Sequence, residues 1–260
     1  MSTAAPLARS AEDLDLVLSA LATPAPAEGV VWRAPLPPPR HGSLGDHRVG
    51  LWLDDPACPV DAATRTALEE LADRLRSAGA SVDSRARPTE LADASEAFRS
   101  LMFASSSVAA PQEAFDREVA SAERLPPGDD RPETLYLRSR TLRHRAWGAL
   151  QEARERVRES WRAYFATHDV LLTPVSPTTA PPDPGEVPVG ERHLLVDGVR
   201  RPYWDQTTWL TLAGLAGLPA VVAPLTVDAG LPLGLQIIGP PLEDRTALRF
   251  AALLGELRGG

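Results

Sequence analysis

Two apolar runs near the C-terminal end constrain the fold more than any other feature of this sequence. Residues 220–227 read AVVAPLTV, and residues 231–238 read LPLGLQII. Runs this continuous are typical of strands that are covered on both faces, as in α/β proteins. Between them lie Asp228, Ala229 and Gly230, a short turn with glycine at its end, so we expect a β-hairpin.

A strand–helix–strand pattern earlier in the chain indicates that part of the sheet is parallel. Residues 48–53 (RVGLWL) have the pattern of a strand, residues 61–79 that of a helix ending at Gly79, and the following SVD that of a short strand. The helix places five apolar residues on one face: Ala63, Leu68, Leu71, Ala72 and Leu75. Residues 169–175 (DVLLTPV) add another apolar segment of strand length. We therefore expect an α/β fold in which a mixed β-sheet is flanked by helices.

Helical periodicity accounts for much of the remaining chain. A capping pattern at Ser10 predicts a helix over residues 10–22. Helical spacing continues over residues 92–120, where Pro111 breaks it, and residues 133–167 are predicted to form one long helix. A last helix is expected to begin at the acidic pair that follows the second apolar run.

Two proline-rich segments separate these elements. Residues 24–46 are predicted to form a surface connection of extended character, and residues 177–188 a loop. No internal repeat of 20 to 50 residues is visible. We therefore expect a single domain over residues 1–260.

The charge pattern excludes several classes of protein. A formal net charge of −8 argues against a general nucleic-acid or anionic-membrane binder. The arginine-rich residues 136–162 suggest phosphate binding, but interleaved glutamates favour a solvated helix face. No apolar run reaches the ~20 residues that span a bilayer, and the N-terminus lacks the pattern of a secretory signal. We expect a cytoplasmic protein that binds neither nucleic acid nor membrane.

The chain contains no lysine, because all 27 basic residues are arginines. Arginine stays protonated in proteins, so no residue here can act as a lysine-type base or Schiff-base amine. The five histidines show no ligand spacing, and the single cysteine, Cys58, is interpreted as structural or incidental. No metal site is expected.

Three adjacent serines are a candidate for a Ser-Ser-Lys hydrolytic centre. Such a centre needs a glycine-rich loop, whose backbone N–H groups reach the oxyanion, and a lysine as base. Ser105, Ser106 and Ser107 instead follow LMFA and precede VAA in a helical segment without glycine. We interpret them as residues that lie on a helix surface or make packing contacts.

Four segments of the chain resemble, in order, the C-terminal part of amidase signature family enzymes. They are APLARSAEDLDLVLSALA, RVGLWLDDP, HDVLLTPVSPTTAPP and the final block from GLAGLPAVVAPL to GLPLGLQIIGPPLEDRTAL. The resemblance runs from Ala5 to Leu254, and its most specific parts are the first and last blocks. It implies an α/β/α enzyme with a large mixed sheet that hydrolyses amide bonds without a metal or organic cofactor.

The resemblance also implies where the catalytic residues of such an enzyme lie. Family members use a serine nucleophile, a bridging serine and a lysine, all within a Gly/Ser-rich signature that precedes the ARSAEDL segment. Here the longer segment APLARSAEDL, which contains it, begins at Ala5, four residues after Met1, and the chain has no lysine. We expect this chain to be the C-terminal portion of such an enzyme, without the signature region and with no catalytic residue of its own.

Other residues carry over as candidates for the wall of the substrate pocket. The resemblance gives substrate-binding roles to Thr173, Pro174, Val175, Gln206 and Trp209. Position favours the first three as well, because α/β proteins bind ligands where strands end at a sheet edge. Packing at the sheet edge is the alternative role for all five. Many relatives have asparagine where this chain has Gly214.

These observations predict an amidase-family hydrolase, acting on a small-molecule amide, that is inactive alone. The alternative is a non-catalytic binding or scaffold subunit, or a pseudoenzyme remnant, that pairs with a separate signature-bearing chain. A late start, gene decay and a split gene each account for the expected missing half. Strands that lack their partners expose unpaired edges and apolar area, so we also expect poor solubility or self-association.

Overall fold

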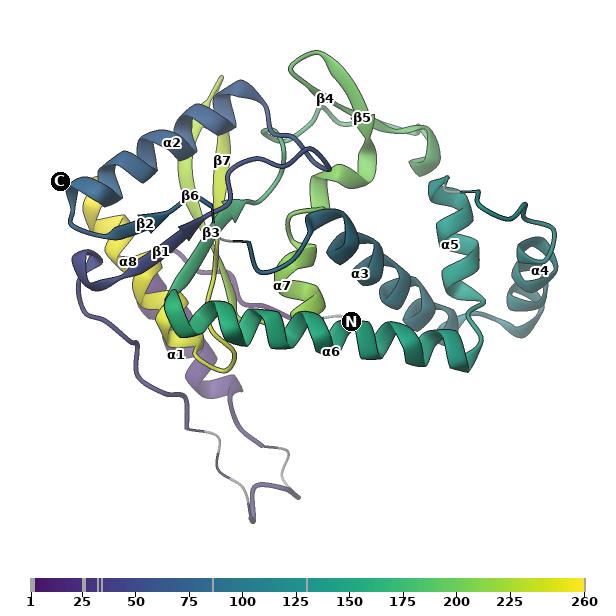
Figure 1. Cartoon of the computed structure of the whole chain (residues 1–260), viewed down its shortest axis with the longest axis horizontal. Helices are drawn as coiled ribbons and strands as arrows, with labels where there is room; N and C mark the ends of the chain where they lie inside the picture. The colour runs from purple at the N-terminus through teal and green to yellow at the C-terminus, as the bar shows by residue number, and fades with distance from the viewer. Residues whose placement is uncertain are drawn as a thin grey trace.

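The computed structural model describes residues 3–24, 27–31, 33, 35–85, 87–129 and 131–259, and its centre is a five-stranded sheet. The strand order is β2-β1-β3-β7-β6 (Figure 1). The strand bounds are Arg48–Leu51 for β1, Ser81–Asp83 for β2, Val170–Pro174 for β3, Ala220–Asp228 for β6 and Leu231–Ile238 for β7. Strand β1 is parallel to β2 and β3, whereas β7 is antiparallel to both β3 and β6. The predicted mixed α/β sheet is confirmed.

The predicted hairpin is confirmed as β6–β7, which closes where Asp228 pairs with Leu231. Ala229 and Gly230 turn the chain with φ angles of 46° and 82°. The prediction that both strands are covered on both faces is confirmed for the second half of β7. It is wrong for β6, where only Leu225 is buried. The reason is position: within the described part of the chain, β6 pairs only with β7 and forms an edge of the sheet.

Helices cover the two faces of the sheet in separate layers (Figure 1). On one face, α2 (Ala62–Ser77) and α8 (Asp244–Gly259) pack in a core that includes Leu68, Leu75 and Phe250. On the other face, α3 (Leu91–Ser106), α6 (His144–Thr167) and α7 (Thr211–Ala216) pack in a core that includes three fully buried tryptophans, Trp52, Trp161 and Trp209. The sheet is therefore the middle layer of an α/β/α arrangement.

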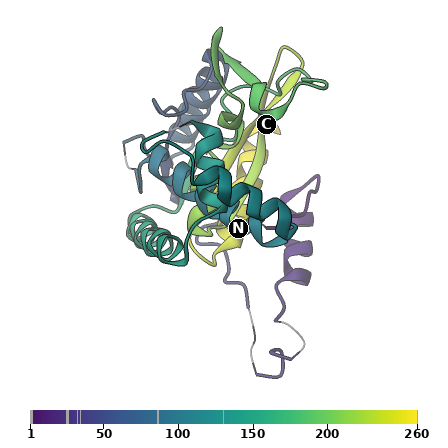
Figure 2. The same ribbon diagram turned by 90° about the vertical axis from the view of Figure 1, so that its right-hand side faces the viewer.

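Two further helices lie at the end of α3 and α6 that is remote from the sheet. Helix α4 spans Gln112–Ala122 and α5 spans Pro132–Arg140; both face the viewer in Figure 2. The prediction of one helix over residues 133–167 is wrong, because Arg143 is extended (φ −70°, ψ 148°) between α5 and α6. Helix α5 packs on α3 and α4 while α6 packs towards the sheet, so tertiary contacts override the continuous helical pattern.

The remaining elements are short. Helix α1 spans Ala11–Leu21, and its predicted cap is confirmed, because Asp13 N–H donates to Ser10 Oγ at 3.1 Å. A second small sheet pairs β4 (His193–Val196) with β5 (Val199–Pro202), which the sequence did not predict. The described residues also form four 3₁₀ turns: η1 (Leu44–Asp46), η2 (Ser107–Ala109), η3 (Val189–Glu191) and η4 (Tyr203–Thr207).

The predicted proline-rich connection is described except at residues 25, 26, 32 and 34. Its end is fixed to the sheet by a buried carboxylate: Asp169 accepts Arg40 Nη1 at 3.1 Å and Arg48 Nη2 at 2.8 Å. His41 Nε2 lies 3.3 Å from the same carboxylate. Among the described helices, none has the length and apolar character to cross a membrane.

Candidate functional site

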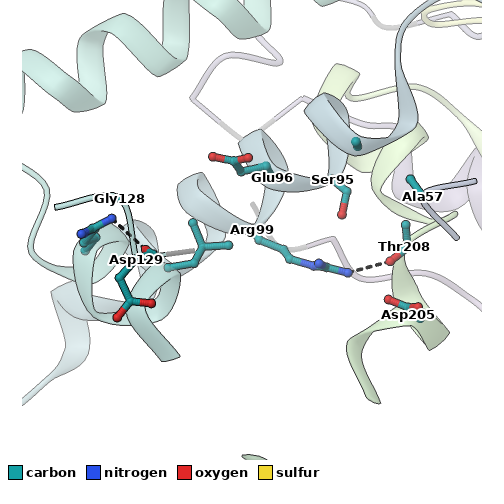
Figure 3. Close-up of a pocket in the computed structure, with 11 residues that line it drawn as sticks. Ala57, Ser95, Glu96, Arg99, Gly128, Asp129, Asp205 and Thr208 are labelled. Atoms are coloured by element: carbon teal, nitrogen blue, oxygen red, sulfur yellow. Dashed lines mark hydrogen bonds between the residues drawn. The ribbon is translucent and has the colours of Figure 1, made fainter. Parts of the chain in front are cut away.

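A cavity of about 500 Å³ lies between α3, α5 and η4 and is the candidate site (Figure 3). Four of its residues are spaced along one face of α3, where positions three and four apart lie side by side. The turn before α5, α5 itself and η4 supply most of the others. The lining residues are Ala57, Ala92, Ser95, Glu96, Arg99, Gly128, Asp129, Leu135, Arg138, Asp205 and Thr208.

Arg99 is a half-buried charged side chain on α3, whereas Asp93 and Glu96 are exposed. Its Nη2 donates to Thr208 Oγ1 at 2.6 Å (Figure 3) and to the Trp204 carbonyl at 3.1 Å. Its Nε is buried and has no hydrogen-bond partner among the described residues. Burial lowers the pKa of the guanidinium, and the nearby Asp205 carboxylate opposes that shift. Arginine nevertheless remains protonated at neutral pH.

Asp205 lies across from Arg99 and is only 6% exposed. Its Oδ2 accepts Arg201 Nε at 2.8 Å, and Arg201 also donates to the Ala57 carbonyl at 2.7 Å. Burial raises the pKa of the Asp205 carboxyl, while Arg201 and then Arg99 oppose that shift. The two guanidiniums therefore offset part of the cost of burying this carboxylate.

Cys58 lies behind Asp205, and its Sγ is 3.5 Å from the Asp205 carbonyl oxygen. The side chain is fully buried, and burial raises the pKa of its thiol to about 12. A thiol with that pKa is not a nucleophile at neutral pH. The interpretation of Cys58 as a structural residue agrees with this environment.

The sequence model of the Amidase family matches residues 1–248 of this chain. The chain belongs to the amidase family. It is 27% identical over 261 residues to an indoleacetamide hydrolase of Bradyrhizobium japonicum, which covers 100% of this chain and 52% of that relative. It is also 34% identical over 114 residues to a glutamyl-tRNA(Gln) amidotransferase subunit of Leptospira interrogans, covering 44% of this chain and 21% of that relative.

Solved structures of the amidase family have the same fold. A bacterial aryl acylamidase of the amidase signature family matches with a TM-score of 0.69 at 18% identity, covering 97% of this chain and 52% of that one. A structure described as amidase matches with a TM-score of 0.67 at 23% identity and the same coverage. This amidase-family chain thus spans about half the length of the relatives that it matches from end to end.

The structure places the five predicted substrate-binding residues close together but outside the cavity lining. Gln236 Nε2 donates to Thr173 Oγ1 at 2.8 Å and to the Trp209 carbonyl at 3.1 Å, and both residues are fully buried. Pro174 is buried, and Val175 and Gln206 are half-buried. Gln206 lies between two positions that do line the cavity, Asp205 and Thr208. Substrate binding by the five residues stays a prediction.

The three adjacent serines of this amidase-family chain are bonded within their own helix. Ser105 Oγ donates to the Leu101 carbonyl at 2.8 Å, and Ser106 Oγ and Ser107 Oγ make similar bonds to α3. Arg140 also donates to Ser106 Oγ at 2.8 Å. These contacts agree with the interpretation of a helix surface.

Sequence reasoning missed Arg99 and Asp205. The available signal was the polar row of Ser95, Glu96 and Arg99, since positions three and four apart share one face of a helix. The pairing of that face with η4 joins residues more than 100 positions apart, which no local pattern contains.

Gly214 has a packing role in this amidase-family chain. An added Cβ would lie 2.5 Å from Phe98 Cε2 on α3, so the ring occupies the space that a larger side chain needs. The asparagine of many relatives could enter here only if Phe98 moved.

Proposed function

We propose that this chain supplies the substrate-side half of an amidase-family hydrolase that cleaves amide C–N bonds of small molecules. The nucleophilic serine, the bridging serine and the lysine base come, in this proposal, from polypeptide outside these 260 residues. One observation carries the proposal: a chain that matches the family model over residues 1–248 contains no lysine.

The proposed chemistry needs groups that this chain does not offer. A neutral lysine takes the proton of the serine nucleophile, whose oxygen attacks the amide carbonyl and displaces the amine or ammonia. Water then hydrolyses the acyl-enzyme. All 27 basic residues here are permanently charged arginines, and Ser105 to Ser107 are bonded to α3 carbonyls. The chain alone is therefore expected to be inactive.

The open edge of the sheet is the proposed contact for the chain that brings the signature. Val222 and Val227 on β6 are 56% and 66% exposed, although their strand is apolar in sequence. An apolar edge strand readily pairs with another strand. Thr173, Pro174, Val175, Gln206 and Trp209 would then form part of the pocket wall beside the joined sheet.

An activity assay tests this function. The purified chain is assayed against phenylacetamide, indoleacetamide and an aryl anilide, alone and with the half of the Bradyrhizobium japonicum relative that it does not align with. We expect no turnover alone and turnover from the mixture that a serine-directed inhibitor abolishes. The matched control is the same half with alanine in place of its signature lysine.

Two outcomes would change the conclusion. Turnover by the chain alone, blocked by a serine-directed inhibitor, would refute the proposal. A stable complex without turnover would instead support the second candidate function, a non-catalytic scaffold or pseudoenzyme remnant that retains only the partner-binding surface.

A further inference from the structure

We propose that the cavity beside Arg99 binds a small organic carboxylate, with the Arg99 guanidinium as its anchor. This inference deepens the proposed function, because it makes amides that carry a free carboxylate the preferred substrate class. Only this choice of substrate class rests on the proposed function. The binding of a carboxylate in the cavity is proposed for this chain by itself.

The hydrogen bonds of Arg99 do not include a carboxylate, although the charge of Asp205 lies close by. Its Nη2 donates only to neutral oxygens, those of Thr208 and Trp204, and its buried Nε has no partner among the described residues. A buried guanidinium without a carboxylate partner is unfavourable. A carboxylate fits the planar edge of a guanidinium through paired N–H···O bonds, and such charge-assisted bonds are roughly twice as strong as neutral ones.

The acidic residues of the cavity do not fill that role. Asp205 is bonded to Arg201 at 2.8 Å, and Asp129 is bonded to Arg131 at 2.7 Å. Arg138, on the α5 side of the cavity, donates to the backbone carbonyls of Asp129 and Pro126.

The lining carries the guanidiniums of Arg99 and Arg138 and the carboxylates of Glu96, Asp129 and Asp205. The two aspartates are bonded to arginines outside the lining, so within the described part of the chain the unpaired charges of the lining are those of Arg99, Arg138 and the exposed Glu96.

The size and lining favour an organic anion over inorganic phosphate. A volume of about 500 Å³ is within the range of small-molecule sites. Ala57, Ala92 and Leu135 supply apolar wall beside the charged groups. An aryl or alkyl body can contact that wall while its carboxylate bonds Arg99.

A purely structural role for Arg99 is the competing explanation, because its bonds tie η4 to α3. The test therefore compares two probes of equal shape, phenylacetate and the neutral phenylacetamide. Ligand-observed NMR measures both affinities and remains usable if the chain self-associates. We expect wild-type chain to bind phenylacetate at least about tenfold more tightly, because a hydrogen bond to a charged group contributes more than a neutral one.

Substitutions then assign the preference to Arg99. Arg99→Gln is expected to weaken phenylacetate binding by about tenfold to a hundredfold and to leave phenylacetamide nearly unchanged. Arg99→Lys keeps the charge but removes the planar edge, so it is expected to retain only part of the preference. It also serves as the informative variant if Arg99→Gln does not fold.

Two matched control variants test whether removing any arginine charge lowers the preference for phenylacetate. Arg154→Gln removes another partly buried arginine, whose Nε donates to the Leu215 carbonyl at 2.6 Å away from the cavity. Arg200→Gln removes an exposed charge from the shallow hollow at the β4–β5 hairpin. Both are expected to keep the preference for phenylacetate.

Equal affinity of the wild-type chain for the two probes, or no binding of either, would overturn the proposal. So would an undiminished preference in Arg99→Gln, or its loss in Arg200→Gln. None of these measurements needs turnover. Failure of the mixed-chain activity assay therefore leaves the binding result intact, and the two proposals can fail separately.

Discussion

Asp169 shows how one buried carboxylate holds distant parts of this chain together. It is fully buried, and its partners come from the end of the proline-rich connection and from the start of β1. Burial acts to raise its pKa, but hydrogen bonds from Arg48 and Arg40 outweigh this and hold the pKa well below its usual range. The surroundings of Asp169 in the folded state therefore stabilise its ionised form more than the unfolded chain does.

Removing the Asp169 carboxylate should lower the free energy of unfolding. It should also make that free energy depend less on pH. Asp169→Asn leaves Arg40 and Arg48 without their shared anion, so we expect a loss of about 3 kcal/mol in the free energy of unfolding at pH 7. Because the folded pKa lies below the unfolded value of about 4, the stabilisation is complete above that pH. It decreases as the pH falls from about 4 towards the folded pKa.

Urea unfolding of dilute protein, followed by tryptophan fluorescence between pH 7 and pH 2.5, measures both effects. The variant should lose less stability than the wild type below pH 4. Asp73→Asn is the control, since Asp73 is 79% exposed in its pair with Arg76 and should matter by less than about 1 kcal/mol. Parallel pH curves for wild type and Asp169→Asn would contradict the assignment.

At the residue scale, the sequence pointed to a segment that approaches the cavity, and the substrate-binding roles given to its residues stay a prediction. It named Gln206 and Trp209, whereas the cavity is lined by their neighbours Asp205 and Thr208. Asp205 and Gln206 lie in the 3₁₀ turn η4, and Thr208 and Trp209 follow it directly. Periodicity cannot assign side-chain directions there, because the turn is only five residues long. Arg99 required the packing of α3 on η4, which is a long-range property.

At the scale of elements, β6 shows what an apolar run cannot reveal. Its sequence is as apolar as that of a central strand, yet only one of its sides is paired within the described chain. Whether a strand is central or at an edge depends on neighbours, and those neighbours need not be in the same 260 residues. The predicted strands, hairpin and most helices followed from local patterns, whereas the break between α5 and α6 followed from tertiary contacts.

Charging the exposed face of β6 should reduce self-association of the isolated chain. Val222→Lys with Val227→Lys replaces two exposed valines on an edge strand by the residue that natural sheets use to block edge pairing. Sedimentation velocity should show a larger monomer fraction for the double variant than for the wild type.

The control for this variant is a valine of similar exposure that is not on an edge strand. Val108 is 88% exposed on η2, so Val108→Lys adds charge without touching the sheet. If Val108→Lys solubilises the chain as well as the β6 variant does, net charge rather than the strand edge governs association.

For the whole molecule, the structure combines a nearly complete α/β/α layering with apolar surface that its own chain does not cover. Besides β6, helix α1 has no buried residue, and Leu16 and Leu21 are 71% and 63% exposed. Helix α1 is nevertheless fixed to α8, since Arg245 bonds Asp15 at 2.8 Å and Ser19 at 2.9 Å. An anchored helix with an uncovered apolar side has the form expected of a surface that another polypeptide completes.

A signature-bearing partner should therefore stabilise this chain as well as activate it. Binding to the folded state alone raises the free energy of unfolding with partner concentration, by about 2.7 kcal/mol at one hundred times the dissociation constant. We expect the thermal midpoint of this chain to rise with added partner half, and its oligomers to convert to a defined heterodimer in light scattering. The Val222→Lys, Val227→Lys variant should show a smaller rise, because the proposed contact includes β6. The contrary outcome is a wild-type chain that is a monodisperse monomer, melts cooperatively and does not respond to the partner half. That result would refute both the proposed contact at β6 and the claim that this chain needs a partner to be stable.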